Sequence, residues 1–441
     1  MNNEDMRDTR RDFLKTSALV AGGVMLNGVA FAQGGAHSSV DDTIKIALIG
    51  CGGRGTGAAF QALGTKQNLK LVAMADAFGD RLESAYKELN EKYADKIDVP
   101  KERRFVGFDA YKKAIALADV VLLATPPGFR PSHFEEAINQ NKHVFMEKPV
   151  AVDSPGVRKV LEVAKIAQQK KLNVVVGLQR RYQTNYREAL KRIEDGMMGD
   201  ITGGQVYWNS GGVWVKPREA NQTEMEYQMR NWYYFNWLCG DHIVEQHVHN
   251  IDIANWVKNA YPVSVQGTGS RAWRTGKDYG EIYDNHSVEL TYADGAVINS
   301  QCRHFEGIDN RVDESFQGTK GRIYLSAGNE AKIWDSKGNA LYNYSSKTNR
   351  NPYEVEHEEL FAAIAKGEYK YWDAERVAKS CLTAIMGRYA TYSGKTITWK
   401  EALEADNSLF PERLAWDAKP KLLPDANGLY PIPTPGKTKV I

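Results

Sequence analysis

Residues 43–55 have the sequence TIKIALIGCGGRG, in which a strand pattern runs directly into a glycine-rich turn. Glycines spaced as G-x-G-x-x-G allow a tight turn, close approach of the backbone to a pyrophosphate, and close packing of the following helix. A helix expected over residues 56–63 would offer its first N–H groups to the phosphates. The turn therefore predicts a dinucleotide site. Its expected cofactor contacts are Gly50, Gly52, Gly53, Arg54 and Gly55.

A second strand pattern, residues 69–75, ends in Asp76. An acidic residue about twenty positions after the last glycine completes the dinucleotide fingerprint. Such a carboxylate binds both ribose hydroxyls and repels a 2′-phosphate, so Asp76 favours NAD over NADP. The alternative for Asp76 is an N-cap of the next helix.

Strands and helices alternate up to residue 178. This alternation predicts a Rossmann-type, doubly wound parallel sheet, and we assign residues 43–178 to an NAD-binding domain. Thr125 and Pro126 follow the buried strand pattern of residues 119–124. Proline cannot continue that strand, so both residues are expected in a loop at the cofactor edge of the sheet.

The sequence KHVFMEKPV, residues 142–150, predicts a short apolar strand that ends in Glu147 and Lys148. Open α/β sheets bind their ligands at the carboxyl ends of the strands. Pro149 disfavours helix at the preceding residue, which keeps Lys148 extended. Both charged residues are therefore expected at the active site and in contact with the cofactor. The alternative is a solvated ion pair at the strand end.

The pattern changes after residue 178, and we assign residues 179–410 to an α/β domain with a large, mostly antiparallel open sheet. Its strands are expected at residues 201–209, 263–273, 285–292, 296–305, 313–317 and 322–326. A long loop, residues 211–236, is rich in aromatic side chains, including Trp232. These rings could stack on a sugar or pack in a core or an interface.

Residues 243–251 predict one helical segment that places Glu245 and His249 on the same face. Histidine is the natural proton carrier near neutral pH, so the favoured role is acid–base chemistry beside a hydride acceptor. Asp252 could orient the ring of His249 or cap a turn. A metal held by His242, Glu245 and His249 and a simple packing role are the alternatives, and we predict no metal.

The 441 residues carry a net charge of +2, which gives no reason to expect nucleic acid or a membrane surface as a partner. Residues 1–32 contain the pair Arg10-Arg11, a mild apolar run and Ala30-Phe31-Ala32. This order predicts a twin-arginine signal peptide and export to the periplasm, without stable membrane insertion. Residues 411–441 form a proline-rich tail, interpreted as an arm that could lie on another subunit.

The chain resembles the Gfo/Idh/MocA family. The resemblance rests on the glycine turn, Thr125-Pro126-Pro127, Glu147-Lys148-Pro149, Arg180-Arg181-Tyr182 and the segment ending His249-x-x-Asp252. It implies a Rossmann domain and an open-sheet domain that often forms oligomers, hence a homodimer or homotetramer. It also implies Lys148 in the active site and His249 as proton acceptor. Glu245 stands where the family usually has aspartate, and His247 where glycine is usual.

The resulting hypothesis is an NAD-dependent oxidoreductase that acts on a sugar, a sugar derivative or a cyclic polyol. Its expected catalytic residues are Lys148, His249 and Glu245. Its expected substrate contacts are Arg181, Tyr182, Trp232 and Asp252. An exported enzyme should retain its nucleotide, so the alternatives are a redox-neutral NAD-dependent glycosidase and sugar-to-sugar hydride transfer. A non-catalytic sugar or nucleotide sensor is a third hypothesis.

Overall fold

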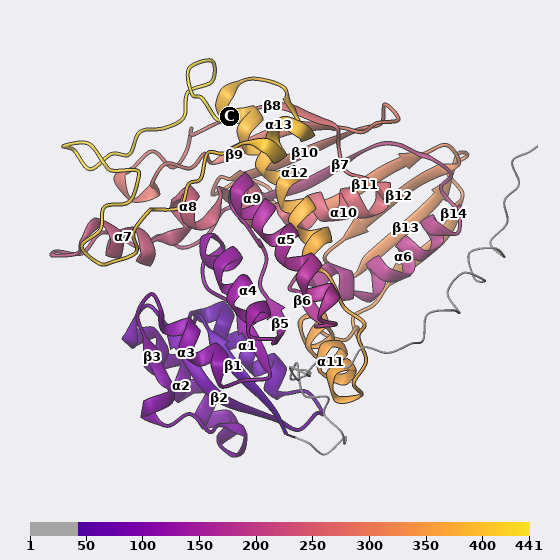
Figure 1. Ribbon diagram of the computed structural model, residues 1–441. Helices are drawn as coiled ribbons and strands as arrows, with labels where there is room; N and C mark the ends of the chain where they lie inside the picture. The colour runs from indigo at the N-terminus through magenta and orange to yellow at the C-terminus, as the bar shows by residue number, and fades with distance from the viewer. Residues whose placement is uncertain (1–42) are drawn as a thin grey trace, which may run out of the picture. The chain divides into compact units, whose positions relative to one another are not determined.

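The computed structural model describes residues 43–441, and the predicted signal peptide lies outside them (Figure 1). The first sheet has six parallel strands in the order β3-β2-β1-β4-β5-β6. They are β1 (Ile44–Ile49), β2 (Leu69–Asp76), β3 (Arg104–Val106), β4 (Val120–Leu123), β5 (His143–Met146) and β6 (Val174–Val176). The predicted doubly wound sheet is confirmed. The strand order reverses between β1 and β4, where such sheets open a ligand crevice.

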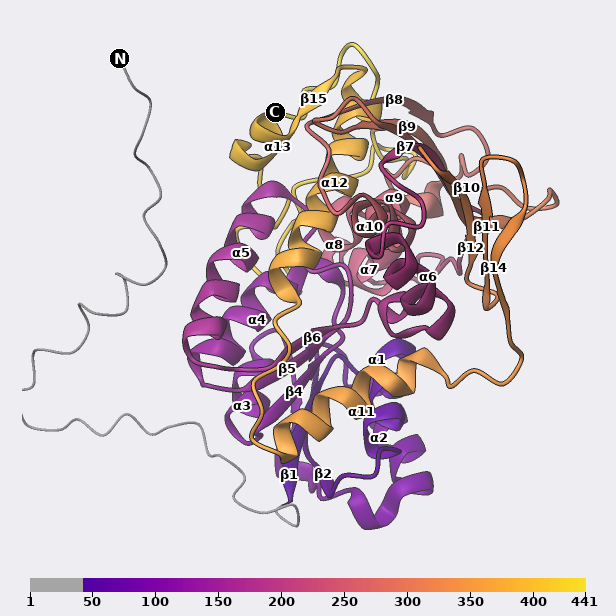
Figure 2. The same cartoon turned by 90° about the vertical axis from the view of Figure 1, so that its right-hand side faces the viewer.

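Helices cover both faces of this sheet because its central strands are buried and apolar on both sides. They are α1 (Gly53–Leu63), α2 (Gly79–Tyr93), α3 (Ala110–Ala116), α4 (Arg130–Asn139) and α5 (Ser154–Gln169). A helix from far along the chain, α11 (Pro352–Ala365), returns to pack beside α1 (Figure 2).

His357, on α11, should make the stability of the protein depend on pH. His357 is fully buried, its ring centre lies 4.0 Å from that of Phe145, and neither ring nitrogen has a hydrogen-bond partner within the described part of the chain. Burial lowers the pKa of His357 to about 3, from 6.5. As the pH falls, His357 is protonated in the unfolded chain before it is protonated in the folded one. His357 therefore costs no stability above pH 6.5, and the free energy of unfolding decreases as the pH drops from 6.5 toward 3.

We expect His357→Phe to raise stability more at pH 5 than at pH 8. The new ring suits the apolar site, and the variant no longer carries a group that takes up a proton on unfolding. The pH slope of stability should lessen by about 1.4 kcal/mol per pH unit below pH 6.5. Urea unfolding at the two pH values measures this. An equal change at both would mean that His357 does not titrate on unfolding.

The second sheet has nine strands in the order β14-β13-β12-β11-β7-β10-β9-β8-β15. They are β7 (Ile201–Ser210), β8 (Ser264–Ser270), β9 (Asn285–Thr291), β10 (Val297–His304), β11 (Arg311–Gly318), β12 (Gly321–Ser326), β13 (Glu330–Asp335), β14 (Ala340–Ser345) and β15 (Ile397–Thr398). Only the β7–β10 pairing is parallel, which confirms a mostly antiparallel sheet.

Three helices lie against this sheet: α6 (Thr184–Glu194), α10 (Val248–Lys258) and α12 (Ala374–Ser393). β9 and β10 accordingly alternate buried and exposed residues, as strands with one covered face do. No helix in residues 43–441 is long and apolar enough to cross a membrane.

Residues 211–236, expected as a loop, contain the helix α7 (Glu224–Arg230) and lead into α8 (Asn236–Cys239). Thr223 caps α7, because its hydroxyl oxygen accepts a hydrogen bond from the backbone N–H of Glu226 at 3.2 Å. Tyr227, Tyr233 and Tyr234 are buried, so this part of the segment is core.

The prediction of a single helix over residues 243–251 is wrong. α9 (His242–Glu245) ends before α10 begins. The backbone N–H of His247 reaches back to the carbonyl of His242 at 3.0 Å, a bond that spans five residues instead of four. Such wide turns interrupt helices at functional sites.

The tail, residues 411–441, packs on its own chain, beside α7 and α8 in Figure 1. The side-chain amide of Gln228 donates to the carbonyl of Leu422 at 2.9 Å, and the ring of Tyr430 lies 5.0 Å from that of Phe235. The tail therefore packs against its own chain.

Candidate active site

A cavity of about 440 Å³ opens at the carboxyl ends of β1, β2 and β4. Eight of the predicted cofactor residues line it: Gly50, Gly52, Gly53, Arg54, Gly55, Asp76, Thr125 and Pro126. Glu147 and Lys148 are not among its lining residues. The cavity thus lies where the fold places a dinucleotide.

The glycine turn forms a cradle that fits a pyrophosphate. A Cβ on Gly50, whose φ is +95°, would lie 2.5 Å from the backbone nitrogen of Thr125, and one on Gly55 would lie 1.8 Å from the carbonyl oxygen of Gly50. Gly52 and Gly53 instead face open space, with nothing within 4 Å of such an atom. α1 begins at Gly53, so its free N–H groups start beside this space.

Gly55→Ala should weaken nucleotide binding by at least about tenfold, because its methyl group cannot fit against the turn without moving the cradle. Gly57→Ala is the matched control on the same helix. Its nearest neighbour would be the Arg54 guanidinium at 3.6 Å, and alanine favours helix. Titration of NADH fluorescence measures both. Equal affinity in the two variants would contradict the role of the cradle.

Asp76 is fixed at the end of β2 by two backbone donors. Its carboxylate accepts hydrogen bonds from the N–H of Cys51 at 2.6 Å and of Phe78 at 2.8 Å. The N-cap of α2 is Phe78, so the alternative role for Asp76 is wrong. Burial raises the pKa of Asp76, and the two N–H groups oppose that rise. Each carboxylate oxygen keeps a lone pair for a ribose hydroxyl.

Glu147 joins the end of β5 to the start of α1. Its carboxylate oxygen lies 2.7 Å from Nε of Arg54, and the missing side chain of Gly177 leaves room for it. Arg130, which was not among the predicted site residues, is buried and donates to the carbonyl of Glu147 at 3.0 Å and to the hydroxyl of Thr125 at 3.3 Å. An arginine in the first turn after Thr125-Pro126-Pro127 was the available signal. A direct cofactor contact by Glu147 stays a prediction.

Lys148 and Glu245 meet across the two domains. Nζ of Lys148 donates to the carboxylate of Glu245 at 2.8 Å and also to its backbone carbonyl. The two side chains are only 13% and 14% exposed, so the pair is largely shielded from water. The Lys148–Pro149 peptide bond is cis. An ammonium has three donors, so one remains for a ligand.

His249 lies at the start of α10, with its ring stacked on Trp208 at 5.7 Å and its Nδ1 without a hydrogen-bond partner in the described chain. Burial, followed by the charges of Lys148 and Arg180, holds the pKa of His249 well below its usual value. The imidazole is therefore neutral at neutral pH and able to accept a proton.

The predicted substrate residues do not all meet. Arg181 and Asp252 form a two-point ion pair, at 2.6 and 3.1 Å, and Ser380 also donates to Asp252 at 2.8 Å. Asp252 therefore orients Arg181, and no hydrogen bond between Asp252 and His249 is seen. The hydroxyl of Tyr182 donates to Asp373 at 3.2 Å. Trp232 lines the cofactor cavity. Substrate contacts by these residues stay predictions.

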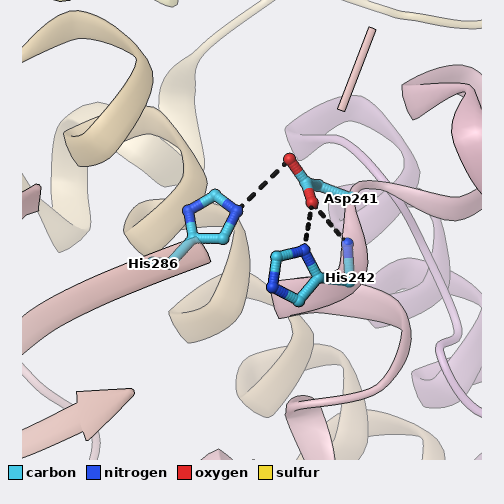
Figure 3. A group of neighbouring side chains, drawn as sticks. All are labelled: Asp241, His242 and His286. Atoms are coloured by element: carbon cyan, nitrogen blue, oxygen red, sulfur yellow. Dashed lines mark hydrogen bonds and ion pairs between the residues drawn. The ribbon is translucent and has the colours of Figure 1, made fainter. Parts of the chain in front are cut away.

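Asp241, His242 and His286 form a buried cluster (Figure 3). Oxygens of Asp241 lie 2.9 Å from Nδ1 of His242 and 3.3 Å from Nε2 of His286. The carboxylate also accepts hydrogen bonds from the hydroxyl of Tyr392 and from the N–H of Tyr283 at 3.0 Å. Burial alone would raise the pKa of Asp241, but the two imidazoles outweigh burial and hold it well below the ordinary range.

These contacts answer the alternative of a metal on His242, Glu245 and His249. Glu245 pairs with Lys148, while His242 turns toward Asp241. Asp241, His242 and His286 have ligand-type atoms within 4.8 Å of one another. Hydrogen bonds already occupy the Asp241 carboxylate, whereas Nε2 of His242 and Nε2 of His286 have no hydrogen-bond partner within the described part of the chain. The absence of a resident metal stays a prediction.

The fold and the cavity define an NAD-binding oxidoreductase with a two-domain architecture. Residues 44–178 match the family model described as "Oxidoreductase family, NAD-binding Rossmann fold", and residues 186–324 match the "GFO/IDH/MocA C-terminal domain". The chain belongs to the Gfo/Idh/MocA family, and NAD is its cofactor.

Relatives agree with this assignment. Inositol 2-dehydrogenase of Rhizobium meliloti is 26% identical over 334 residues, which cover 74% of this chain and 90% of the relative. A glycosyl hydrolase family 109 protein of Streptomyces coelicolor is 28% identical over 180 residues, 40% of this chain and 35% of the relative. The structure of scyllo-inositol dehydrogenase from Lactobacillus casei with NAD(H) and scyllo-inositol shares the fold, with a TM-score of 0.62, 20% identity and coverage of 81% and 100%.

Proposed function

We propose that the protein oxidises a secondary hydroxyl group of a sugar, a sugar derivative or a cyclic polyol by hydride transfer to NAD. The observation that carries the proposal is the shielded Lys148–Glu245 pair at the end of β5. The positive charge of Lys148 contributes to the lowered pKa that keeps His249 neutral. A fixed cation beside a base is what alcohol oxidation needs, because an alkoxide forms as the hydroxyl proton leaves.

Each residue has a separate role. His249 takes the proton of the reacting hydroxyl. Lys148 keeps one free donor for the developing alkoxide, while Glu245 holds the ammonium in place through its carboxylate and carbonyl. Bound NAD supplies the hydride acceptor at its nicotinamide ring. The substrate class is supported by the names of the relatives, whose inositols carry secondary hydroxyls on a ring.

A second candidate function is a redox-neutral glycosidase. Transient oxidation of a sugar hydroxyl, elimination of the aglycone, addition of water and re-reduction would cut a glycoside and restore NAD. The family 109 glycosyl hydrolase among the relatives supports this candidate, as does the expected export to a compartment without a pool of free nucleotide. Hydride transfer from one sugar to another would close the same cycle. A sensor is disfavoured because Lys148 and His249 are both present.

Two assays on the purified protein separate the candidates. Formation of NADH at 340 nm with inositols and free sugars, dependent on added NAD, supports the oxidoreductase. Release of an aryl group from glycosides without added NAD supports the glycosidase. If neither assay gives turnover across the inositols, common aldoses and their aryl glycosides, the proposed substrate class is wrong.

We also propose export by the twin-arginine route and assembly into a homodimer or homotetramer through the open sheet. Replacing Arg10 and Arg11 by lysine should leave the precursor in the cytoplasm, and cell fractionation would detect it. Sedimentation of the mature protein would give the number of chains. A monomer at micromolar concentration would contradict the assembly.

A further inference from the structure

The cofactor cavity has a second wall that comes from outside the Rossmann domain. Trp214, Lys216, Met229, Arg230 and Trp232 line it together with the glycine turn and Asp76. These residues belong to the segment 213–232, which we call the outer wall. We propose that the outer wall, held by Arg230 and Trp416, closes over the nucleotide and slows its dissociation. The proposal deepens the proposed function and rests on its use of NAD.

Arg230 ties the outer wall to the rim of the nucleotide crevice. Its guanidinium donates to both carboxylate oxygens of Asp80, at 3.0 and 3.2 Å, and lies 4.1 Å from the ring centre of Phe78. Both partners follow Asp76 closely in the chain, at the ribose end of the site. A two-point ion pair combined with a cation–π contact fixes an arginine in one geometry.

Trp416 secures the same rim from the tail. Its ring lies 5.0 Å from that of Phe78 and 4.6 Å from that of Phe108, and both phenylalanines line the cavity. Aromatic contacts at these separations favour defined ring orientations. Trp416 does not line the cavity itself, so it acts as a positioning residue.

The tail and the outer wall are joined to each other. Arg218 donates to the hydroxyl of Tyr430 at 3.1 Å, and that hydroxyl donates to Glu224. One hydrophobic cluster includes Phe129 of the Rossmann domain, Trp232 of the outer wall and Trp416 of the tail. Opening the outer wall would therefore break several packed contacts at once. Such closure lowers the rate at which the nucleotide dissociates.

The test loads the mature, full-length protein with NADH, adds excess NAD and follows the loss of bound NADH fluorescence without any sugar present. Arg230→Ala and Trp416→Ala should each speed dissociation by at least about tenfold. Arg413→Ala is the matched control, since it removes an exposed ion pair with Asp417 beside Trp416. It should keep the wild-type rate. Melting temperatures of the nucleotide-free proteins check that all variants are folded.

The double variant Asp80→Arg with Arg230→Asp restores the ion pair with its charges exchanged. It distinguishes an effect of the Asp80–Arg230 ion pair from a direct contact between Arg230 and a phosphate of the nucleotide. Slow dissociation should return in the exchanged pair only if the ion pair is what closes the wall. The proposal would be overturned if the wild-type protein exchanged its bound NADH within the mixing time. It would also be overturned if Arg230→Ala and Trp416→Ala both released NADH at the wild-type rate. Lys148→Met should still exchange slowly, so a failure of the catalytic proposal remains distinguishable from a failure of this one.

Discussion

Lys148→Met should lower the rate of substrate oxidation by about 10³-fold while NAD binding stays near normal. The variant keeps the length of the side chain but loses the charge that faces the forming alkoxide. It also leaves Glu245, which is only 14% exposed, without its cation. Initial rates under saturating NAD, with kcat and KM measured separately, test this. The loss should fall on kcat, because the alkoxide exists only in the transition state.

Lys142→Met is the control, at the opposite end of the same strand region. Its Nζ donates to the carbonyl of Ala116 at 3.5 Å, on the side of the sheet away from the cofactor. It should keep near wild-type kcat. Undiminished turnover in Lys148→Met would remove Lys148 from the chemistry, and with it the reaction derived from its pairing with Glu245.

The Rossmann half was predictable because its signals are local. Glycine positions in the turn, the distance to Asp76 and the apolar strands each depend on neighbours in the sequence. The structure adds the reasons: Gly50 and Gly55 have no room for a side chain, and Asp76 is held by two backbone N–H groups.

The rest of the site depends on contacts between distant residues. Helical spacing placed Glu245 and His249 on one face, yet a wide turn at His247 separates their helices. The partner of Asp252 is Arg181 and not His249, because the buried carboxylate takes the nearest guanidinium. Spacing along one segment cannot reveal such pairings.

The outer wall and the tail were missed for the same reason. Aromatic residues in the sequence at 211–236 indicated packing or sugar stacking without a partner. In the structure Tyr233 and Tyr234 are buried, whereas Trp214 and Trp232 line the cofactor cavity. The contact of Trp416 with Phe78 spans most of the chain, and no local pattern marks it.

His249→Ala should lose about 10³-fold in oxidation rate, and added imidazole should restore part of it by entering the space beside Trp208. The pH profile tests the assignment further. Because burial and Lys148 hold the pKa of His249 well below 6.5, the base stays neutral as the pH falls through 6.5, and the acid limb of kcat should lie below that value.

Removing the charge of Lys148 has a predicted sign. In Lys148→Met one of the influences that lower the pKa of His249 is gone, so the pKa rises and the acid limb of the residual activity moves up toward pH 6.5. In His249→Ala the limb should disappear. An acid limb that stays in place in both variants would assign it to another group, and His249 would then be a packing residue against Trp208.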